Sequence, residues 1–179
     1  MRRNENIDPN SLNRPEGNDL VSNYDKHDTA EGRVKASLEA AGLTVENWGI
    51  DMRHDGGDGL IFDDKMDLKV YASTWNGEEY ADALVGIVEV KYKSNDYYMF
   101  KINRRHWRHY VQIAAEYNVP TYIVFDNGEM LHWCRVSETL VVDTFAFPDG
   151  NEGVLLSNDY YTTNEAVSCL LDNQQASDG

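Results

Sequence analysis

Cysteine is scarce in this chain of 179 residues, which contains only Cys134 and Cys169. Two cysteines are too few for a disulfide framework or for a four-cysteine zinc or iron–sulfur site. Long hydrophobic runs are also missing, since apolar segments such as residues 83–88 fall far short of the ~18 to 20 residues that a membrane helix needs. The first residues are not followed by the apolar segment of a signal peptide. We therefore expect a cytoplasmic protein with no membrane partner.

Positive charge is the other scarce feature, because 16 Lys and Arg residues face 31 Asp and Glu residues and give a net charge of -15. Such a charge opposes encounter with a polyanion. One explanation is a high-salt cytoplasm, as in a halophile or its virus, where screening is strong and an acidic surface keeps a protein hydrated. The alternatives are an ordinary acidic protein and a DNA mimic that binds a DNA-binding protein.

The few positive charges are concentrated in one segment. Residues 91–109 carry six Lys and Arg residues and one Asp, so this segment has a charge of +5 and the rest of the chain -20. A basic segment in an acidic chain favours a phosphate-binding surface, for which a DNA mimic has little use; a solvated helix face is the alternative. The basic residues that we expect to contact nucleic acid are Lys93, Lys101, Arg104, Arg105 and Arg108.

Hydrophobic periodicity predicts a mixed α/β domain. A helix is expected from Asp28, which can cap it, to Gly42, and a second helix over 103–118 before Pro120. The predicted order of elements places a helix on each face of one sheet. We expect a flexible arm over residues 1–25, the α/β domain over 26–147 and a C-terminal extension over 148–179. The expected strands cover 43–50, 68–71, 84–91, 121–125, 130–136 and 140–147, and a short helix covers 163–172.

The candidate catalytic pattern is Glu89-Val90-Lys91. It lies at the end of the most strand-like segment, residues 84–91. Residues two apart in a strand point to the same face, so Glu89 and Lys91 can share one site while Val90 packs behind them. Asp67 stands at the head of another strand, and its carboxylate can meet that of Glu89 if the two strands are neighbours.

Two adjacent carboxylates suit Mg²⁺ or Mn²⁺, and a nearby ammonium can orient or deprotonate a water or offset charge on a phosphate. These groups are suited to phosphodiester hydrolysis. A salt-bridged Glu–Lys pair on a surface strand would give the same sequence pattern. Asp63 and Asp64 are alternatives to Asp67, which is preferred because it directly precedes the apolar strand.

Residues 28–136 resemble the PD-(D/E)xK nuclease superfamily, which includes restriction endonucleases, archaeal Holliday-junction resolvases and RecB-like nuclease domains. The similar features are a first helix with an acid, an Asp strand over 67–71, a Glu-x-Lys strand over 88–91 and a basic helix leading into the strand at 119–125. Met66 stands where the family often has proline, which weakens the motif without removing it. The resemblance implies a restriction-endonuclease-like core, with a central mixed β-sheet flanked by helices.

The resemblance also implies a nuclease that uses Mg²⁺ or Mn²⁺ to hydrolyse DNA. Asp67 and Glu89 would hold the metal, Lys91 would assist the water, and Glu31 would complete the site. Glu31 also fits a helix-capping arrangement with Asp28, so its role stays open. Gln112 is similar to the second-helix glutamine of some RecB-like members and would contact nucleic acid.

Two rival functions remain from the sequence alone. One is a nuclease-fold DNA-binding protein without catalysis, and the other is an acidic interaction or structural protein. His106 and His109 lack a third ligand at suitable spacing, so DNA contact or surface exposure is favoured over a metal site. The structure of the DNA substrate, endonucleolytic or exonucleolytic cleavage, and a homodimer are left open.

Overall fold

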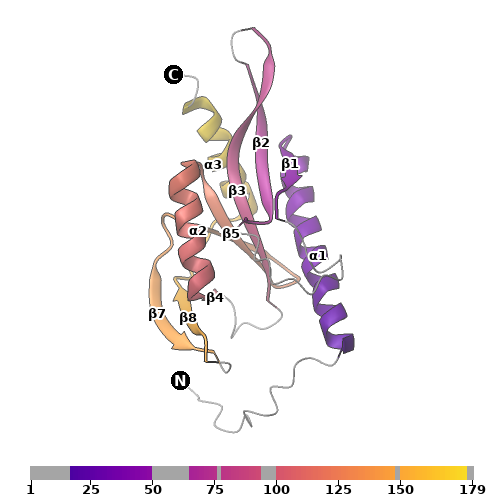
Figure 1. Ribbon diagram of the computed structural model, residues 1–179. Helices are drawn as coiled ribbons and strands as arrows, with labels where there is room; N and C mark the ends of the chain where they lie inside the picture. The colour runs from indigo at the N-terminus through magenta and orange to yellow at the C-terminus, as the bar shows by residue number, and fades with distance from the viewer. Residues whose placement is uncertain (1–16, 50–64, 76–77, 94–99, 148–149, 177–179) are drawn as a thin grey trace.

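Five strands form the central sheet of the computed structural model, which describes residues 17–49, 65–75, 78–93, 100–147 and 150–176 (Figure 1). The strand order is β1-β2-β3-β5-β6. β3 and β5 are parallel, and the other neighbouring pairs are antiparallel, so the predicted mixed sheet is confirmed. The strands are β1 (Thr44–Asn47), β2 (Leu68–Trp75), β3 (Tyr80–Tyr92), β5 (Thr121–Asp126) and β6 (Leu131–Arg135).

A second, three-stranded sheet has the order β4-β8-β7. It consists of β4 (Lys101–Asn103), β7 (Val141–Ala146) and β8 (Glu152–Leu156), all paired antiparallel. The sequence prediction missed β4 and β8. Because β8 pairs with β7, the predicted boundary at residue 147 falls between two partners of one sheet.

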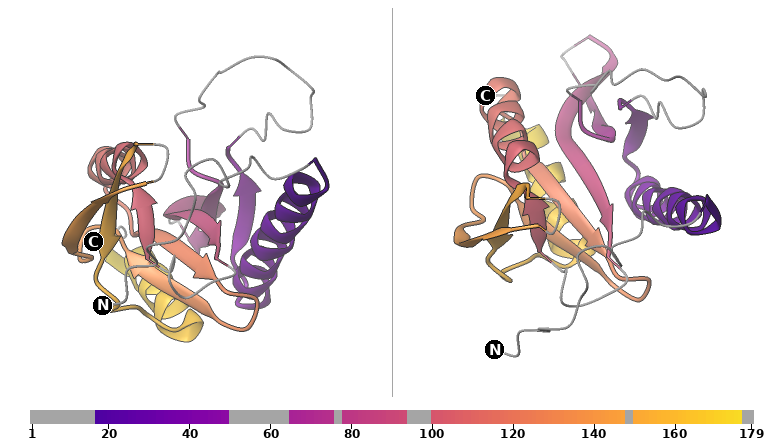
Figure 2. Two further views of the ribbon diagram at one scale, coloured as in Figure 1. Left: turned by 90° about the horizontal axis from the view of Figure 1, so that it is seen from below. Right: turned by 60° about the horizontal axis from the view of Figure 1, so that its bottom comes forward.

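Three helices cover the central sheet (Figure 2). Helices α1 (Gly17–Ala40) and α3 (Thr163–Ala176) share one core with the sheet, as Val34 and Leu170 pack against Val88 and Val90. Helix α2 (Arg104–Tyr117) shares the other core, in which its Ile113 joins residues such as Ile87. Alternate side chains of β3 therefore serve opposite faces, and the predicted helix on each face is confirmed. None of the helices in the described ranges is long and apolar enough to cross a membrane.

Helix α1 begins at Gly17, so the predicted start at Asp28 was wrong. The predicted boundary between arm and domain at residue 25 also falls within α1. The last of the added turns makes tertiary contacts that local sequence does not reveal: His27 lies 3.1 Å from the carbonyl oxygen of Val90, and the Lys26 ammonium lies 5.9 Å from the Tyr92 ring. The predicted end is confirmed, since Gly42 has a φ of 84° and its N–H donates to Glu39.

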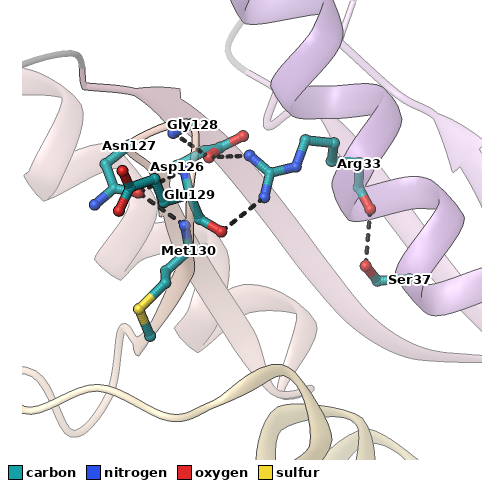
Figure 3. A network of polar contacts seen from close by, with 7 residues as sticks. All are labelled: Arg33, Ser37, Asp126, Asn127, Gly128, Glu129 and Met130. Atoms are coloured by element: carbon teal, nitrogen blue, oxygen red, sulfur yellow. Dashed lines mark hydrogen bonds and ion pairs between the residues drawn. The ribbon is translucent and has the colours of Figure 1, made fainter.

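An ion pair fastens α1 to the β5–β6 hairpin (Figure 3). Arg33 Nη1 lies 2.7 Å from Asp126 Oδ1, which also accepts a 2.7 Å hydrogen bond from the N–H of Gly128. Arg33 Nη2 donates to the Glu129 carbonyl at 3.2 Å. The Asp126 carboxylate is almost fully buried, with 2% of its side chain exposed, so these donors replace the water that it loses on folding.

Candidate active site

Asp67 and Glu89 come together at the junction of β2 and β3. Leu68 pairs with Val88 in the antiparallel ladder, so Asp67 and Glu89 lie one step further along it. The backbone N–H of Val90 donates a 2.7 Å hydrogen bond to Asp67 Oδ2. The sequence-based expectation that Asp67 meets Glu89 across neighbouring strands is consistent with this register.

Glu89 is buried, with 5% of its surface exposed, and two donors act on a single oxygen of its carboxylate. The Lys91 ammonium donates to Oε1, and the Tyr110 hydroxyl donates to the same atom at 2.7 Å. Glu89 and Lys91 thus share one face of β3, as the spacing of two residues predicts. Tyr110 reaches them from α2, a contact that the sequence analysis did not identify.

The electrostatics of the site is dominated by acids brought together away from water. Burial, followed by the neighbouring Glu89 carboxylate, raises the pKa of Asp67 from 3.8 to about 7, although Lys91 and the Val90 N–H oppose this rise. Burial acts to lower the pKa of Lys91, but Glu89, Tyr110 and Asp67 outweigh it and hold the pKa above its ordinary value. Lys91 is therefore an ammonium at neutral pH.

Helix α1 contributes two further groups near these residues. The Glu31 carboxylate also raises the pKa of Asp67, which puts it within electrostatic reach of the pair. Because α1 begins at Gly17, Asp28 lies inside the helix and the capping alternative for Glu31 is wrong. His27, one helical turn before Glu31, contacts the Val90 carbonyl at 3.1 Å. A separation of 63 residues hid this contact from the sequence.

The donor set fits a hard divalent cation through its two strand carboxylates. Asp67 and Glu89 are oxygen donors whose proximity raises the pKa of Asp67, and a divalent cation would relieve this repulsion. In the ranges that the structure describes, no three His, Cys, Asp or Glu side chains are grouped closely enough to hold a metal. Mg²⁺ keeps several waters among its ligands, so one or two protein carboxylates are enough to hold it.

A groove of about 510 Å³ runs along α2 beside the turn between β7 and β8. At its wall, Arg104 Nη1 lies 2.9 Å from Glu152 Oε2, an ion pair between largely exposed side chains. Gln112 lines this groove, and the residue on α2 that contacts Glu89 is Tyr110. The groove is lined by Asn103, Arg104, Arg105, Arg108, His109, Gln112, Asn151 and Glu152.

The predicted nucleic-acid set includes two lysines: Lys93 follows the last residue of β3, and Lys101 is the first residue of β4. Lys93 Nζ donates a 3.0 Å hydrogen bond to the Lys101 carbonyl, and the Lys101 ammonium lies 5.0 Å from the Phe145 ring. Burial, followed by the charges of Lys91 and Lys101, lowers the pKa of Lys93 to about 8. Asp63 and Asp64, the alternatives to Asp67, lie outside the described residues.

The two histidines of α2 have different surroundings in the structure. Burial, followed by the Lys91 ammonium, lowers the pKa of His106, which is also within electrostatic reach of Glu89. His109 lines the α2 groove. Both rings lie 6.3 Å from the Tyr110 ring.

No family model and no curated protein matches the chain. Among solved structures, a nuclease from a fusellovirus is similar at a TM-score of 0.50 and 12% identity, with 87% of this chain and 95% of that chain covered. The Holliday junction resolvase Hjc of Archaeoglobus fulgidus is similar at a TM-score of 0.49 and 14% identity, with 80% of this chain and 96% of that chain covered. The similarity to the viral nuclease shows a shared fold.

Proposed function

We propose that this chain is a nuclease that hydrolyses DNA phosphodiester bonds with Mg²⁺ or Mn²⁺ held by Asp67 and Glu89. The observation that carries the proposal is the buried contact of Glu89 with Lys91, next to Asp67. Burying two acids side by side costs folding free energy, and strongly shifted pKa values gather at functional sites. The fold shared with a viral nuclease supports the same function.

The chain's own residues have separate tasks in this proposal. The bound metal would supply positive charge that lowers the pKa of a water and polarises the phosphate. Lys91, being an ammonium, donates hydrogen bonds to that water or to the phosphate and does not act as a base. In hydrolysis the water oxygen bonds to phosphorus, the bond to one ester oxygen breaks, and a proton ends on that oxygen. Glu31 adds negative charge beside Asp67 and so strengthens the site's preference for a cation.

DNA is the proposed substrate because positive charge is concentrated on α2, the helix whose Tyr110 contacts Glu89, and on Lys93, two residues after Lys91. The α2 groove is lined by Arg104, Arg105, Arg108 and Gln112. Lys93 donates a hydrogen bond to the Lys101 carbonyl and lies within electrostatic reach of Lys91. Arginine and lysine contacts to phosphates position a nucleic acid irrespective of its sequence. We infer that these residues bind the backbone while the carboxylates act on one phosphate.

Cleavage of end-labelled DNA tests the proposal. The substrates are a duplex, a single strand, a flap and a four-way junction, each with Mg²⁺, Mn²⁺ or EDTA, at low and at molar salt. We expect metal-dependent cleavage by the wild type, and we expect Glu89→Gln and Asp67→Asn to abolish it. The control Glu116→Gln, which replaces an exposed acid on α2, should still cleave. Cleavage that survives in Glu89→Gln overturns the assignment.

The same panel separates the rival functions. DNA binding by the wild-type protein without cleavage under any metal condition would favour a nuclease-fold binding protein. Neither binding nor cleavage would favour an acidic interaction protein. The buried contacts of Asp67 and Glu89 are what favours a nuclease over both rivals.

A further inference from the structure

We propose that Tyr110 is a positioning residue, which fixes the Glu89 carboxylate in the orientation that binds the metal. This inference rests on the proposed function. Its basis is a single buried contact between two layers of the fold: the Tyr110 hydroxyl on α2 donates a 2.7 Å hydrogen bond to Glu89 Oε1 on β3.

Both partners of this hydrogen bond are removed from water. Tyr110 is 4% exposed and Glu89 is 5% exposed. A hydrogen bond from a neutral hydroxyl to a buried carboxylate is stronger than one between neutral groups, because the charge has lost its hydration. The Tyr110 ring packs with Ile113 and Ile123 in the core between α2 and the sheet, which holds the hydroxyl in place.

The arrangement of donors restricts the rotation of Glu89. Lys91 and Tyr110 both donate to Oε1, from β3 and from α2 respectively. A carboxylate whose one oxygen is held from two directions has little freedom to rotate, so the other oxygen can serve a cation. The Lys91 ammonium also lies 6.0 Å from the centre of the Tyr110 ring, at the outer limit of a cation–π interaction.

A buried tyrosine could instead serve packing alone, and Tyr110→Phe separates the two roles because it keeps the ring and removes only the hydroxyl. The probe is Mn²⁺ alone, titrated into the full chain by calorimetry, so the readout does not depend on cleavage. Partners that orient metal ligands typically account for roughly 10- to 100-fold in metal affinity. We expect Mn²⁺ binding at least about tenfold weaker in Tyr110→Phe. Tyr117→Phe, on the same helix and packed edge-on against Trp48, should bind as the wild type does.

A further variant keeps the test decisive. In a Glu89→Gln background, Tyr110→Phe should have no additional effect, because the carboxylate that it positions is absent. The urea midpoint of each variant separates loss of orientation from loss of folding.

The outcomes distinguish this inference from the proposed function. If Tyr110→Phe binds Mn²⁺ as the wild type does, the positioning role is overturned, even when the wild type cleaves DNA. If the wild type binds Mn²⁺ but cleaves no DNA, the proposed function fails and a weakened Tyr110→Phe still supports the positioning role. If the wild type binds no Mn²⁺, both are overturned.

Discussion

Asp67 lies against the backbone of Val90, whose N–H donates a 2.7 Å hydrogen bond to its carboxylate. This contact holds the Asp67 charge beside Glu89, and the pKa of Asp67 rises to about 7, first through burial and then through that neighbour. The site therefore keeps two acids together at a cost to the fold, which a cation would offset.

Replacing Asp67 by Asn should stabilise the metal-free protein at pH 8 and should stabilise it clearly less at pH 5. An acid with a raised pKa binds more protons in the folded state than in the unfolded state, so its contribution to stability falls as the pH rises from about 4 to about 7. A rise of three pKa units sets an upper limit of about 4 kcal/mol, since one unit corresponds to about 1.4 kcal/mol. Urea unfolding in EDTA at both pH values measures the gain, and Asp82→Asn, at an exposed position on β3, is the control. An equal gain at both pH values would contradict the assignment.

The sequence predicted the strands of the central sheet and the pairing of Glu89 with Lys91 because both follow from local rules. β3 and β5 are continuous apolar runs, and residues two apart on a strand share a face, which placed Glu89 with Lys91. Asp67 was preferred because it directly precedes the apolar strand β2. These rules need no knowledge of which elements meet in space.

The sequence did not predict contacts between distant elements. His27 and Val90 are 63 residues apart, and β4 is a strand of three residues whose partner β8 lies about 50 residues later. On α2, residues two positions apart point about 200° apart, so Gln112 lines the groove while Tyr110 faces Glu89. Which of the two faced the sheet depended on packing, not on the identity of either residue.

Replacing Arg33 by Met should destabilise the protein by about 2 kcal/mol, because the buried Asp126 carboxylate would lose its ion pair. Among the described residues, the backbone N–H of Gly128 would remain as its donor. The methionine preserves much of the apolar stem of Arg33. Urea unfolding measures the loss, and Lys35→Met, which removes an exposed i,i+4 pair with Glu39, should change stability by less than about 0.5 kcal/mol. Equal effects of the two substitutions would show that the ion pair does not fasten α1 to the hairpin.

Gly86 and Gly32 should respond in opposite ways to alanine. A Cβ at Gly86 would lie 2.2 Å from Leu170 Cδ2 and 3.1 Å from the Pro120 carbonyl, so α3 would be pushed from the sheet at a cost of about 1 to 3 kcal/mol. A Cβ at Gly32 meets nothing within 4 Å, and alanine inside a helix is favoured over glycine by roughly 0.5 to 1 kcal/mol. Thermal unfolding of both variants tests the packing of α1 and α3; a harmless Gly86→Ala would contradict the position of Leu170.

Glu152→Gln should strengthen DNA binding several-fold at low salt. Glu152 forms an ion pair with Arg104 at the wall of the α2 groove. Removing the Glu152 charge frees this arginine to contact a phosphate and removes a negative charge that repels the DNA backbone. Fluorescence anisotropy of a labelled duplex in EDTA measures binding without cleavage, and the gain should shrink as salt increases. Asp172→Asn removes one negative charge from α3, which packs on the face of the sheet opposite α2. This variant should bind DNA with wild-type affinity. A similar gain in both variants would show that net charge, and not the groove, determines affinity.

The affinity for DNA should fall between pH 7 and pH 9.5 through the loss of one charge, that of Lys93. Burial, followed by the charges of Lys91 and Lys101, lowers the pKa of Lys93 to about 8. Its side chain is therefore mostly a charged ammonium at pH 7 and mostly a neutral amine at pH 9.5. A phosphate bound beside Lys93 favours the protonated form, so binding takes up a proton and weakens as the pH rises. Lys93→Arg keeps its charge throughout and should bind with a flatter pH profile, whereas Lys93→Met should bind weakly and equally flatly. The three proteins share all other titrating groups, so their differences in anisotropy titrations isolate this position. Parallel profiles for the wild type and Lys93→Arg would show that Lys93 does not contact the DNA.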